Sequence, residues 1–274
     1  MVGCRKITSI AQPNMRSNSV TSAIVLRTRP FGEADKIVSF ITEDFGKVTG
    51  IAKGAMRSRK RFVNSLEPFA LVNLRFQDRP QNSLAFILAA ELLFGYRQLS
   101  TSLERMSHAA YLVEVTDGLI SDRQENLAVY RHLRDSLRYL EECGTSLRFL
   151  TSFELKLLRL VGYQPVLDNC KRCRKDYFNE ISRQWHFSLI DGSILCDSCA
   201  GSRRETLPLS PRAVEILTAL QSESDALPES LSLPFSVIKE MRAVTQSFVQ
   251  FHMDREIKSA AFLDQFSSAY LDTN

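Results

Sequence analysis

The sequence lacks the long apolar stretches that membrane and secreted proteins carry. Charged or turn residues break every apolar run before it approaches the roughly 18–20 residues that a membrane-spanning helix needs. The first 20 residues contain Arg5 and Lys6 but only scattered apolar residues after them, so they hold no secretory hydrophobic region. We therefore expect a protein of the cytoplasm that does not use a membrane.

Motifs for nucleotide hydrolysis and for common catalytic chemistry are also missing. No G-x-x-x-x-G-K-[ST] occurs, since Gly46-Lys47 lacks the upstream glycine and Gly54 precedes an alanine. The four histidines lie apart, outside any G-x-S-x-G or H-E-x-x-H sequence. We expect the protein to work without ATP and not to be an enzyme.

What the chain does have is enough apolar sequence for a real core. Its 274 residues are 44% hydrophobic and 24% charged, which suits two compact units and excludes a disordered chain. Residues 1–19 read as an unstructured polar leader, and Met15 within it is a possible translation start. No internal repeat or low-complexity tract is visible.

The charge is distributed unevenly between the two parts of the chain. Residues 1–80 hold 14 Lys and Arg against 6 Asp and Glu, whereas the remaining 194 residues hold 21 against 25. A field of one sign on one domain predicts a polyanionic partner for that domain, and the acidic remainder is ordinary solvated surface. We expect the N-terminal part to bind nucleic acid.

The stretch 20–96 has the pattern of five short strands. The apolar, β-branched runs TSAIVLRTR, KIVSFIT, KVTGIAKG, FALVNLRF and SLAFILAAELLF alternate with turn residues such as Gly32, Gly46 and Gly54. Five strands in so short a segment suit a small closed barrel. The oligonucleotide-binding (OB) barrel, whose grooves accept single-stranded nucleic acid, is the leading candidate.

After Gln98 the apolar period becomes helical. Helices are predicted over 103–120, 127–140, 147–161, 211–221 and 236–252. The spacing of Ser121 and Gln124 suggests a capping box before the second of these, and Ser210-Pro211 suggests an N-cap followed by proline at the first helical position. The expected fold class is α+β multidomain: an OB barrel, then a helical domain with an inserted zinc finger. Its ranges are a leader (1–19), the barrel (20–96), helices (97–165), the finger (166–204) and further helices (205–274).

Four cysteines carry the strongest chemical signal. Cys170-x-x-Cys173 and Cys196-x-x-Cys199 each offer two thiolates to one ion, and WHFSLIDGSIL between them reads as a hairpin with a type I′ turn at Asp191-Gly192. Because the four positions are all filled by protein, we expect one structural zinc ion with no open site for water. A redox dithiol would need a single such motif at a helix start. His186 is a weak alternative ligand.

A run of cations is the second signal. Five fall in nine residues between the third and fourth expected strands, enough to neutralise several phosphates in a flexible loop. Phe62 follows as a possible stacking face for a base, or else as a ring that closes the barrel. Cations on the flanking strands add to the candidate DNA-binding residues. The expected DNA-binding residues are Lys53, Arg57, Arg59, Lys60, Arg61 and Phe62, with Arg27, Arg29, Lys47 and Arg75.

These motifs together resemble the bacterial recombination and repair family RecO. The resemblance covers residues 21–220 and is carried by AIVLRTRPFGEADKIVSFITEDFGKVTGIAKGAMRSR, by FELKLLRLVGYQP and by the two cysteine pairs. It implies an OB domain, a helical domain with a zinc finger, and a mediator role in the RecF pathway of DNA damage repair and recombination. That role comprises binding single- and double-stranded DNA, annealing complementary strands, and helping recombinase replace single-strand-binding protein.

The resemblance also implies partners, and one different function stays open. The implied partners are RecR and the acidic C-terminal tail of single-strand-binding protein. The helical part suits such protein contacts, with Arg131, Arg134 and Arg138 as cations for the tail. The resemblance further implies a nucleoid-associated location. The alternative is a metal-dependent nucleic-acid-processing enzyme with an OB domain and a zinc ribbon, which would need clustered carboxylates.

Overall fold

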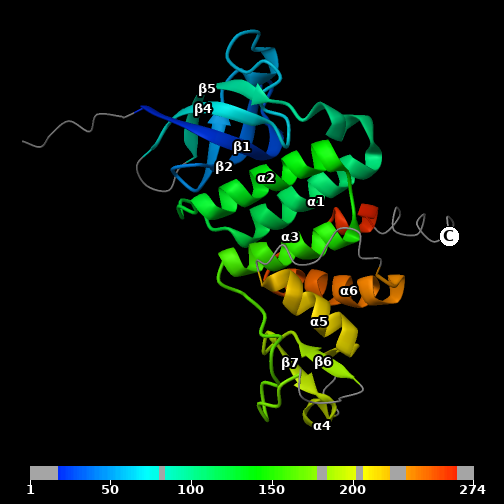
Figure 1. Ribbon diagram of the computed structural model, residues 1–274. Helices are drawn as coiled ribbons and strands as arrows, with labels where there is room; N and C mark the ends of the chain where they lie inside the picture. The colour runs from blue at the N-terminus through cyan, green and yellow to red at the C-terminus, as the bar shows by residue number, and fades with distance from the viewer. Residues whose placement is uncertain (1–17, 80–83, 178–183, 202–205, 223–232, 264–274) are drawn as a thin grey trace, which may run out of the picture.

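A barrel, a layer of helices and a small sheet follow one another along the molecule (Figure 1). The computed structural model describes residues 18–79, 84–177, 184–201, 206–222 and 233–263. The barrel comes first in the chain, the helices lie in the middle, and the small sheet lies at the far end from the barrel. The leader falls outside the described residues except for Asn18 and Ser19, which begin the first strand.

Five strands close into the barrel, as the sequence predicts. Their order is β1-β2-β3-β5-β4, with every neighbouring pair antiparallel except β3 and β5. Alternate residues of β3 and β4 point into the barrel, so the two-residue apolar period of the sequence fills its interior. The strands are β1 (Asn18–Phe31), β2 (Asp35–Thr42), β3 (Lys47–Ala52), β4 (Leu71–Gln77) and β5 (Ala85–Phe94).

One wall of the barrel is buried on both faces. β2 is buried continuously from Ile37 to Thr42, and Ile24, Leu26 and Ile41 belong to the core of the helical part and not to the barrel interior. These residues of β1 and β2 meet helices, which explains why their sequences read as continuous apolar runs. The β1–β2 wall therefore faces the helical layer, and β4 and β5 lie on the other side (Figure 1).

The helical layer matches the expected helices to within a few residues. The long helices are α1 (Leu103–Leu119), α2 (Leu127–Cys143), α3 (Leu147–Leu160), α5 (Pro211–Gln221) and α6 (Phe235–Phe251). Ser210 caps α5 by accepting a hydrogen bond from Ala213 N at 3.2 Å, with Pro211 at the first helical position. No helix of the described part of the chain is long and apolar enough to cross a membrane.

The helix α2 begins at Leu127 as predicted, but the capping box predicted before it is wrong. The capping residue is Asn126, whose side chain accepts a hydrogen bond from Val129 N at 3.0 Å. Ser121 to Gln124 lie before the helix because the barrel holds them there: Arg123 N donates to the Lys47 carbonyl at 3.0 Å, and Arg123 has a φ of 63°. A contact with another domain overrides the local capping pattern.

A buried ionic cluster joins three helices of the layer. Glu154 of α3 is fully buried and accepts hydrogen bonds from Arg242 Nη1 and Thr245 Oγ1 of α6, each at 2.5 Å, and from the Tyr111 hydroxyl of α1. Burial, and then the Glu154 carboxylate, raise the pKa of Tyr111 well above its usual value, so the phenol stays protonated and donates. Arg242 also lies 5.4 Å from the Tyr111 ring centre.

The small sheet has the order β7-β6-β8. β6 (Trp185–Ser188) and β7 (Ser193–Cys196) form the expected hairpin, but Ser188 pairs with Ser193, so the loop has four residues and not two. The prediction of a two-residue type I′ turn is therefore wrong. Instead, Ser188 Oγ donates a hydrogen bond to Asp191 Oδ2 at 2.9 Å and accepts one from Asp191 N at 3.2 Å. The third strand, β8 (Thr206–Leu209), comes from the segment expected to be helical.

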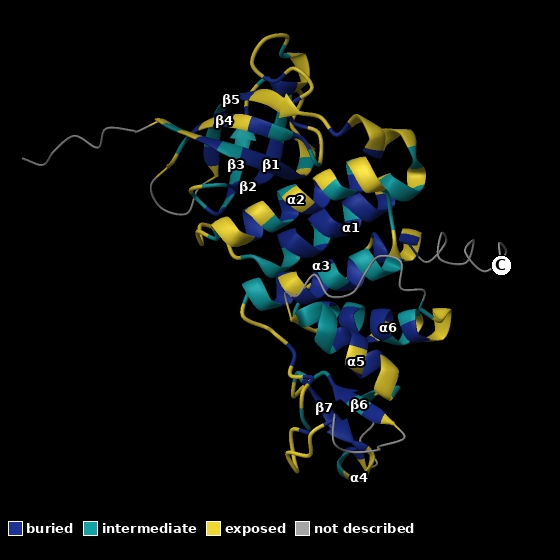
Figure 2. Ribbon diagram, viewed as in Figure 1, coloured by how far each residue is buried: buried dark blue, intermediate teal, exposed yellow. Residues whose placement is uncertain are grey.

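The sheet shares one continuous core with the helices. Trp185 and Phe187 of β6 are fully buried, and the Phe187 ring meets Phe248 of α6 edge to face at 5.1 Å. Figure 2 shows this buried path running from α3 through α5 and α6 into the sheet. The finger is thus anchored in the helical layer and is not a tethered appendage.

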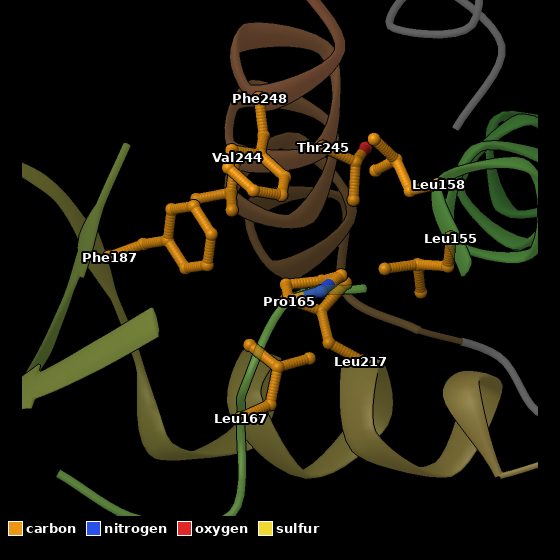
Figure 3. Close-up of a pocket in the computed structure, with 9 residues that line it drawn as sticks. All are labelled: Leu155, Leu158, Pro165, Leu167, Phe187, Leu217, Val244, Thr245 and Phe248. Carbon is orange, nitrogen blue, oxygen red and sulfur yellow. The ribbon is translucent and has the colours of Figure 1, made fainter. Parts of the chain in front are cut away.

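An apolar cavity lies where the sheet meets the helices (Figure 3). Its volume is about 10 Å³, about that of one water-sized probe, and Phe187, Leu217 and Phe248 are among the side chains around it. Ligand pockets for small molecules are many times larger. The cavity is therefore a packing gap and not a ligand site.

Candidate nucleic-acid interface and metal centre

The cationic segment between β3 and β4 is an ordered loop, not the flexible one expected. It contains a 3-10 turn, η1 (Ala55–Arg57), and Gly54 N donates to Asp35 Oδ1 at 2.8 Å. Arg61 braces the loop, because its Nη2 donates to the Lys53 carbonyl at 2.7 Å. Ala90 N of β5 donates to the Arg61 carbonyl at 3.0 Å. The backbone of the loop and the side chain of Arg61 are therefore held against the barrel.

The loop presents its charges to solvent. All five of its cations are exposed, and the loop, in light blue in Figure 1 and largely yellow in Figure 2, lies at the end of the barrel away from α1–α3. Three further cations from the expected set are exposed on the strands. The exposed members of that set are Lys53, Arg57, Arg59, Lys60, Arg61, Arg27, Arg29 and Arg75.

Lys47 does not belong to this surface, and its assignment to DNA is corrected. Its side chain is 14% exposed, and its Nζ lies 2.8 Å from Asp117 Oδ1 and donates to the Asp117 carbonyl at 2.9 Å. Asp117, in α1, also accepts from Arg255 Nη2 at 2.5 Å. Lys47 joins the barrel to the helical layer, so its charge is already neutralised inside the protein.

Replacing Lys47 by Met is expected to destabilise the protein by about 1–3 kcal/mol, because Asp117 loses a buried partner. Burial raises the pKa of Asp117, but the hydrogen bonds from Arg255 and Lys47 outweigh it and the net shift is downward. A lowered folded-state pKa means that the contribution is present above the unfolded value of about 4 and disappears as the pH falls through the folded value. Urea unfolding at pH 7 and pH 3 should show the difference between the two proteins shrinking in acid. An unchanged stability at pH 7 would contradict this assignment, and the DNA affinity should stay the same.

Phe62 is a core side chain, so the stacking role is corrected in favour of the barrel-closing alternative. It is 6% exposed and packs within the barrel interior. The Arg61 guanidinium lies 5.0 Å from its ring centre. A base cannot reach a ring covered in this way.

An aromatic residue that the sequence analysis missed lies near the cationic loop. Phe86 of β5 is half-buried on the outside of the barrel, opposite Ile51 of β3 and Gln77 of β4. The Arg79 guanidinium carbon lies 3.3 Å from its ring centre, and Lys53 Nζ lies 5.5 Å from it. The apolar alternation of β5 made Phe86 look like one more strand residue, and only strand register shows which cations it meets.

The four cysteines come together as predicted. Their sulfur atoms lie within 4.8 Å of one another, and Cys173 Sγ and Cys196 Sγ are 3.7 Å apart. Two sulfurs bound to one tetrahedral ion at a Zn–S distance of about 2.3 Å are about 3.8 Å apart. The cysteines come from the loop that follows α3, from the end of β7 and from α4 (Asp197–Ala200). The donor set fits one tetrahedral metal ion with no position left for water.

Backbone groups surround the sulfurs. Burial raises the pKa of Cys170, but backbone N–H groups, including Cys196 N at 3.4 Å, outweigh this and lower it to about 6. Burial raises the pKa of Cys196 to about 12. Without an ion, the thiolate of Cys170 is therefore favoured, whereas ionisation of Cys196 is unfavourable. A bound cation would stabilise both thiolates.

His186 is not part of this centre. Its Nε2 lies 2.9 Å from Asp197 Oδ1, and the group of possible metal ligands found in the described residues consists of the four cysteines alone. His132 is hydrogen-bonded to the Phe153 carbonyl at 3.1 Å, and burial lowers its pKa to about 4. Both contacts are structural.

The three arginines expected to hold an acidic tail lie along α2, and two of them have acidic partners. Arg134 Nη2 pairs with Asp135 at 2.9 Å, and Arg138 Nε lies 3.9 Å from Glu142 one turn away. Arg131 and Arg138 are exposed, and Arg134 is half-buried. These surface pairs are weak and leave the cations accessible to a stronger anionic partner.

The fold combines an OB-type barrel, which carries an ordered cationic loop, with a helical layer and a four-cysteine centre. These features define a class of multidomain OB-barrel proteins. Comparison with known proteins identifies the family within this class. The family described as "Recombination protein O N terminal" matches residues 15–96, and "Recombination protein O C terminal" matches residues 100–261. The chain belongs to the RecO family.

Relatives with this name align with about nine-tenths of the chain. The DNA repair protein RecO of Syntrophus aciditrophicus is 31% identical over 92% of this chain and 97% of the relative. The RecO proteins of Caldanaerobacter subterraneus and Symbiobacterium thermophilum are 31% and 32% identical, each over 90% of this chain and over 98% and 96% of the relatives. The similarity therefore includes the barrel, the helical layer and the finger together.

Proposed function

We propose that this protein is a DNA-binding recombination mediator of the RecF pathway. It binds single- and double-stranded DNA, anneals complementary strands without ATP, and helps recombinase replace single-strand-binding protein. The observation that carries the proposal is the ordered cationic loop at the exposed end of an OB barrel, in a chain of the RecO family. The protein supplies no covalent step in this role.

The physical argument begins with the phosphates of the DNA backbone. Lys and Arg side chains that neutralise phosphates release counterions, and this term favours any sequence equally. A group of exposed cations such as Arg57, Arg59 and Lys60 binds a backbone without reading bases. Two complementary strands held on such surfaces lose part of their mutual repulsion, which is what annealing requires.

We assign a structural role to the metal centre, with Zn²⁺ as the ion. Four thiolate donors, the 3.7 Å spacing of two sulfurs and the absence of a fifth position for water are the features of a structural zinc site. The ion would hold the β6–β7 hairpin against the loop that follows α3. It takes no part in the handling of DNA.

The proposed partners are RecR and the C-terminal tail of single-strand-binding protein, bound in the cytoplasm at the nucleoid. The helical part is the better surface for the tail, because Arg131, Arg134 and Arg138 form an accessible cationic row on α2. The alternative, a metal-dependent nucleic-acid-processing enzyme, requires clustered carboxylates. Among the described residues, the group of potential metal ligands is formed by cysteines, so no observation favours that alternative.

Annealing provides the functional test. Two complementary oligonucleotides should anneal at least tenfold faster with the protein than without it, at equal rates with and without ATP, because the charge effect needs no nucleotide. Fluorescence quenching between labelled strands measures the rate. A strict requirement for ATP, or conversion of the DNA to shorter products, would contradict the proposal.

A further inference from the structure

The outer surface of the barrel next to the cationic loop carries a ring that is stacked with a guanidinium. Arg79 lies 3.3 Å from the centre of the Phe86 ring, which is van der Waals contact, so its plane covers the ring while Arg79 itself is exposed. Asp78, its neighbour in sequence, is directed to Arg123 at 2.5 Å. The guanidinium of Arg79 is thus positioned by an aromatic face.

Three contacts fix this pair in place. Phe86 lies opposite Ile51 of β3 and Gln77 of β4, in the register that closes the barrel. Lys53 Nζ approaches the same ring to 5.5 Å, and the carbonyl of Lys53 is bonded to Arg61. The pair is therefore continuous with the loop that we assign to phosphate binding.

We propose that Arg79 and Phe86 form a stacking position for one base of single-stranded DNA. The base would stack on the outer face of the Arg79 guanidinium, and Phe86 would hold that guanidinium flat beneath it. Flat guanidinium groups and aromatic rings are the surfaces on which unpaired bases stack, and stacking tolerates any base because every base has a π face. This proposal rests on the proposed DNA binding and adds a preference for unpaired strands, since the bases of a duplex are already stacked.

The charge on Arg79 distinguishes stacking from simple attraction. A lysine keeps the positive charge but has no plane, so Arg79→Lys preserves phosphate attraction and removes stacking. Phe86→Leu preserves apolar volume on the barrel and removes the flat support. Arg97→Lys is the matched control, because Arg97 is also exposed but lies in the 3-10 turn η2 (Arg97–Thr101), outside the expected DNA-binding set.

The test compares binding to two oligonucleotides of equal length, one of thymidines and one with abasic sites at every position. One stacked base is worth about 1–3 kcal/mol, so the unmodified protein should prefer the thymidine strand by about five- to 150-fold. Arg79→Lys and Phe86→Leu should lose most of this preference while binding the abasic strand as before, with unchanged salt dependence. Arg97→Lys should behave as the unmodified protein. Unfolding midpoints confirm that the variants are folded, and Arg79→Lys alone decides the question if Phe86→Leu is unstable.

The possible outcomes distinguish a failure of base stacking from a failure of the proposed DNA binding. Equal binding of both strands by the unmodified protein, unchanged binding by Arg79→Lys, or equal losses on both strands would each overturn stacking while leaving phosphate binding intact. Failure of the unmodified protein to bind either strand, or binding that does not respond to salt, would overturn the proposed function itself.

Discussion

Replacing Cys196 by Ser is expected to remove the bound metal ion and to unfold the β6–β7 hairpin. Structural zinc in small finger domains supplies on the order of 10 kcal/mol of apparent binding free energy, and a serine hydroxyl does not replace a thiolate. Cys196 lies at the end of β7, directly opposite Trp185. Loss of the ion therefore exposes a residue that is fully buried in the intact protein.

The measurement uses the fact that the chain has a single tryptophan. Metal analysis should find one zinc ion per chain in the unmodified protein and almost none in Cys196→Ser. The emission of Trp185 should shift to longer wavelength in the variant, and a chelator should produce the same shift. Cys143→Ser is the control, because Cys143 is exposed at the end of α2 and should leave both readings unchanged. A variant that keeps its zinc, or an unmodified protein that never contains any, would contradict the assignment.

The second large effect is expected in the ionic cluster of the helical layer. Glu154→Gln should destabilise the protein by about 3–5 kcal/mol, because Arg242 then keeps its charge in a buried site without a counter-charge. A loss of this size lowers the thermal midpoint of a domain this large by roughly 10 °C. Burial lowers the pKa of Arg242, but the coulombic effect of Glu154 outweighs it, so the net shift of the pKa is upward. The guanidinium therefore stays protonated and charged.

A double-mutant comparison separates the ion pair from general damage to the core. Replacing Glu154 by Gln and Arg242 by Met together removes both charges, so the double variant should lose much less than the sum of the two single variants. Leu150→Ala, at a fully buried apolar position of α3, is the control and should add independently to Arg242→Met. Additive losses from Glu154 and Arg242 would contradict a coupled cluster.

The sequence was sufficient for the features that local pattern determines. The two-residue period of β3 and β4 and the glycine turns predict the barrel, and the helical period predicts the long helices to within a few residues. The cysteine pairs predict the metal centre because Cys-x-x-Cys spacing and a hairpin bring the four sulfurs together almost without reference to the rest of the fold. Each of these signals is local.

The errors concern residues whose partners are distant in sequence. In the sequence Lys47 resembles the other surface cations. The fold places Asp117 of α1 beside it, 70 residues away along the chain. Phe62 looks available for stacking on a base in the sequence, but the closed barrel buries it. The strand β8 has only four residues, one of them Pro208, and so short a segment gives no recognisable strand pattern. Arg79 and Phe86 are brought together by strand register, which no local pattern encodes.

The central claim is that the ordered cationic loop binds the DNA backbone. Changing Arg57, Arg59 and Lys60 together to Ala removes three exposed charges and leaves Arg61, which braces the loop through Lys53. Each lost contact with a single strand changes the slope of log affinity against log salt by about 0.7, so the triple variant should flatten the slope by about 2. A matched triple variant, Arg212, Lys239 and Lys258 to Ala, removes three exposed charges from the helical part and should leave the slope unchanged.

The direct measurement is therefore a salt titration of the binding of single-stranded DNA by these three proteins. The account predicts a slope about 2 units less negative for the loop variant alone, with no change in sequence preference. A loop variant that unfolds at the normal midpoint and binds with the slope and affinity of the unmodified protein would contradict it.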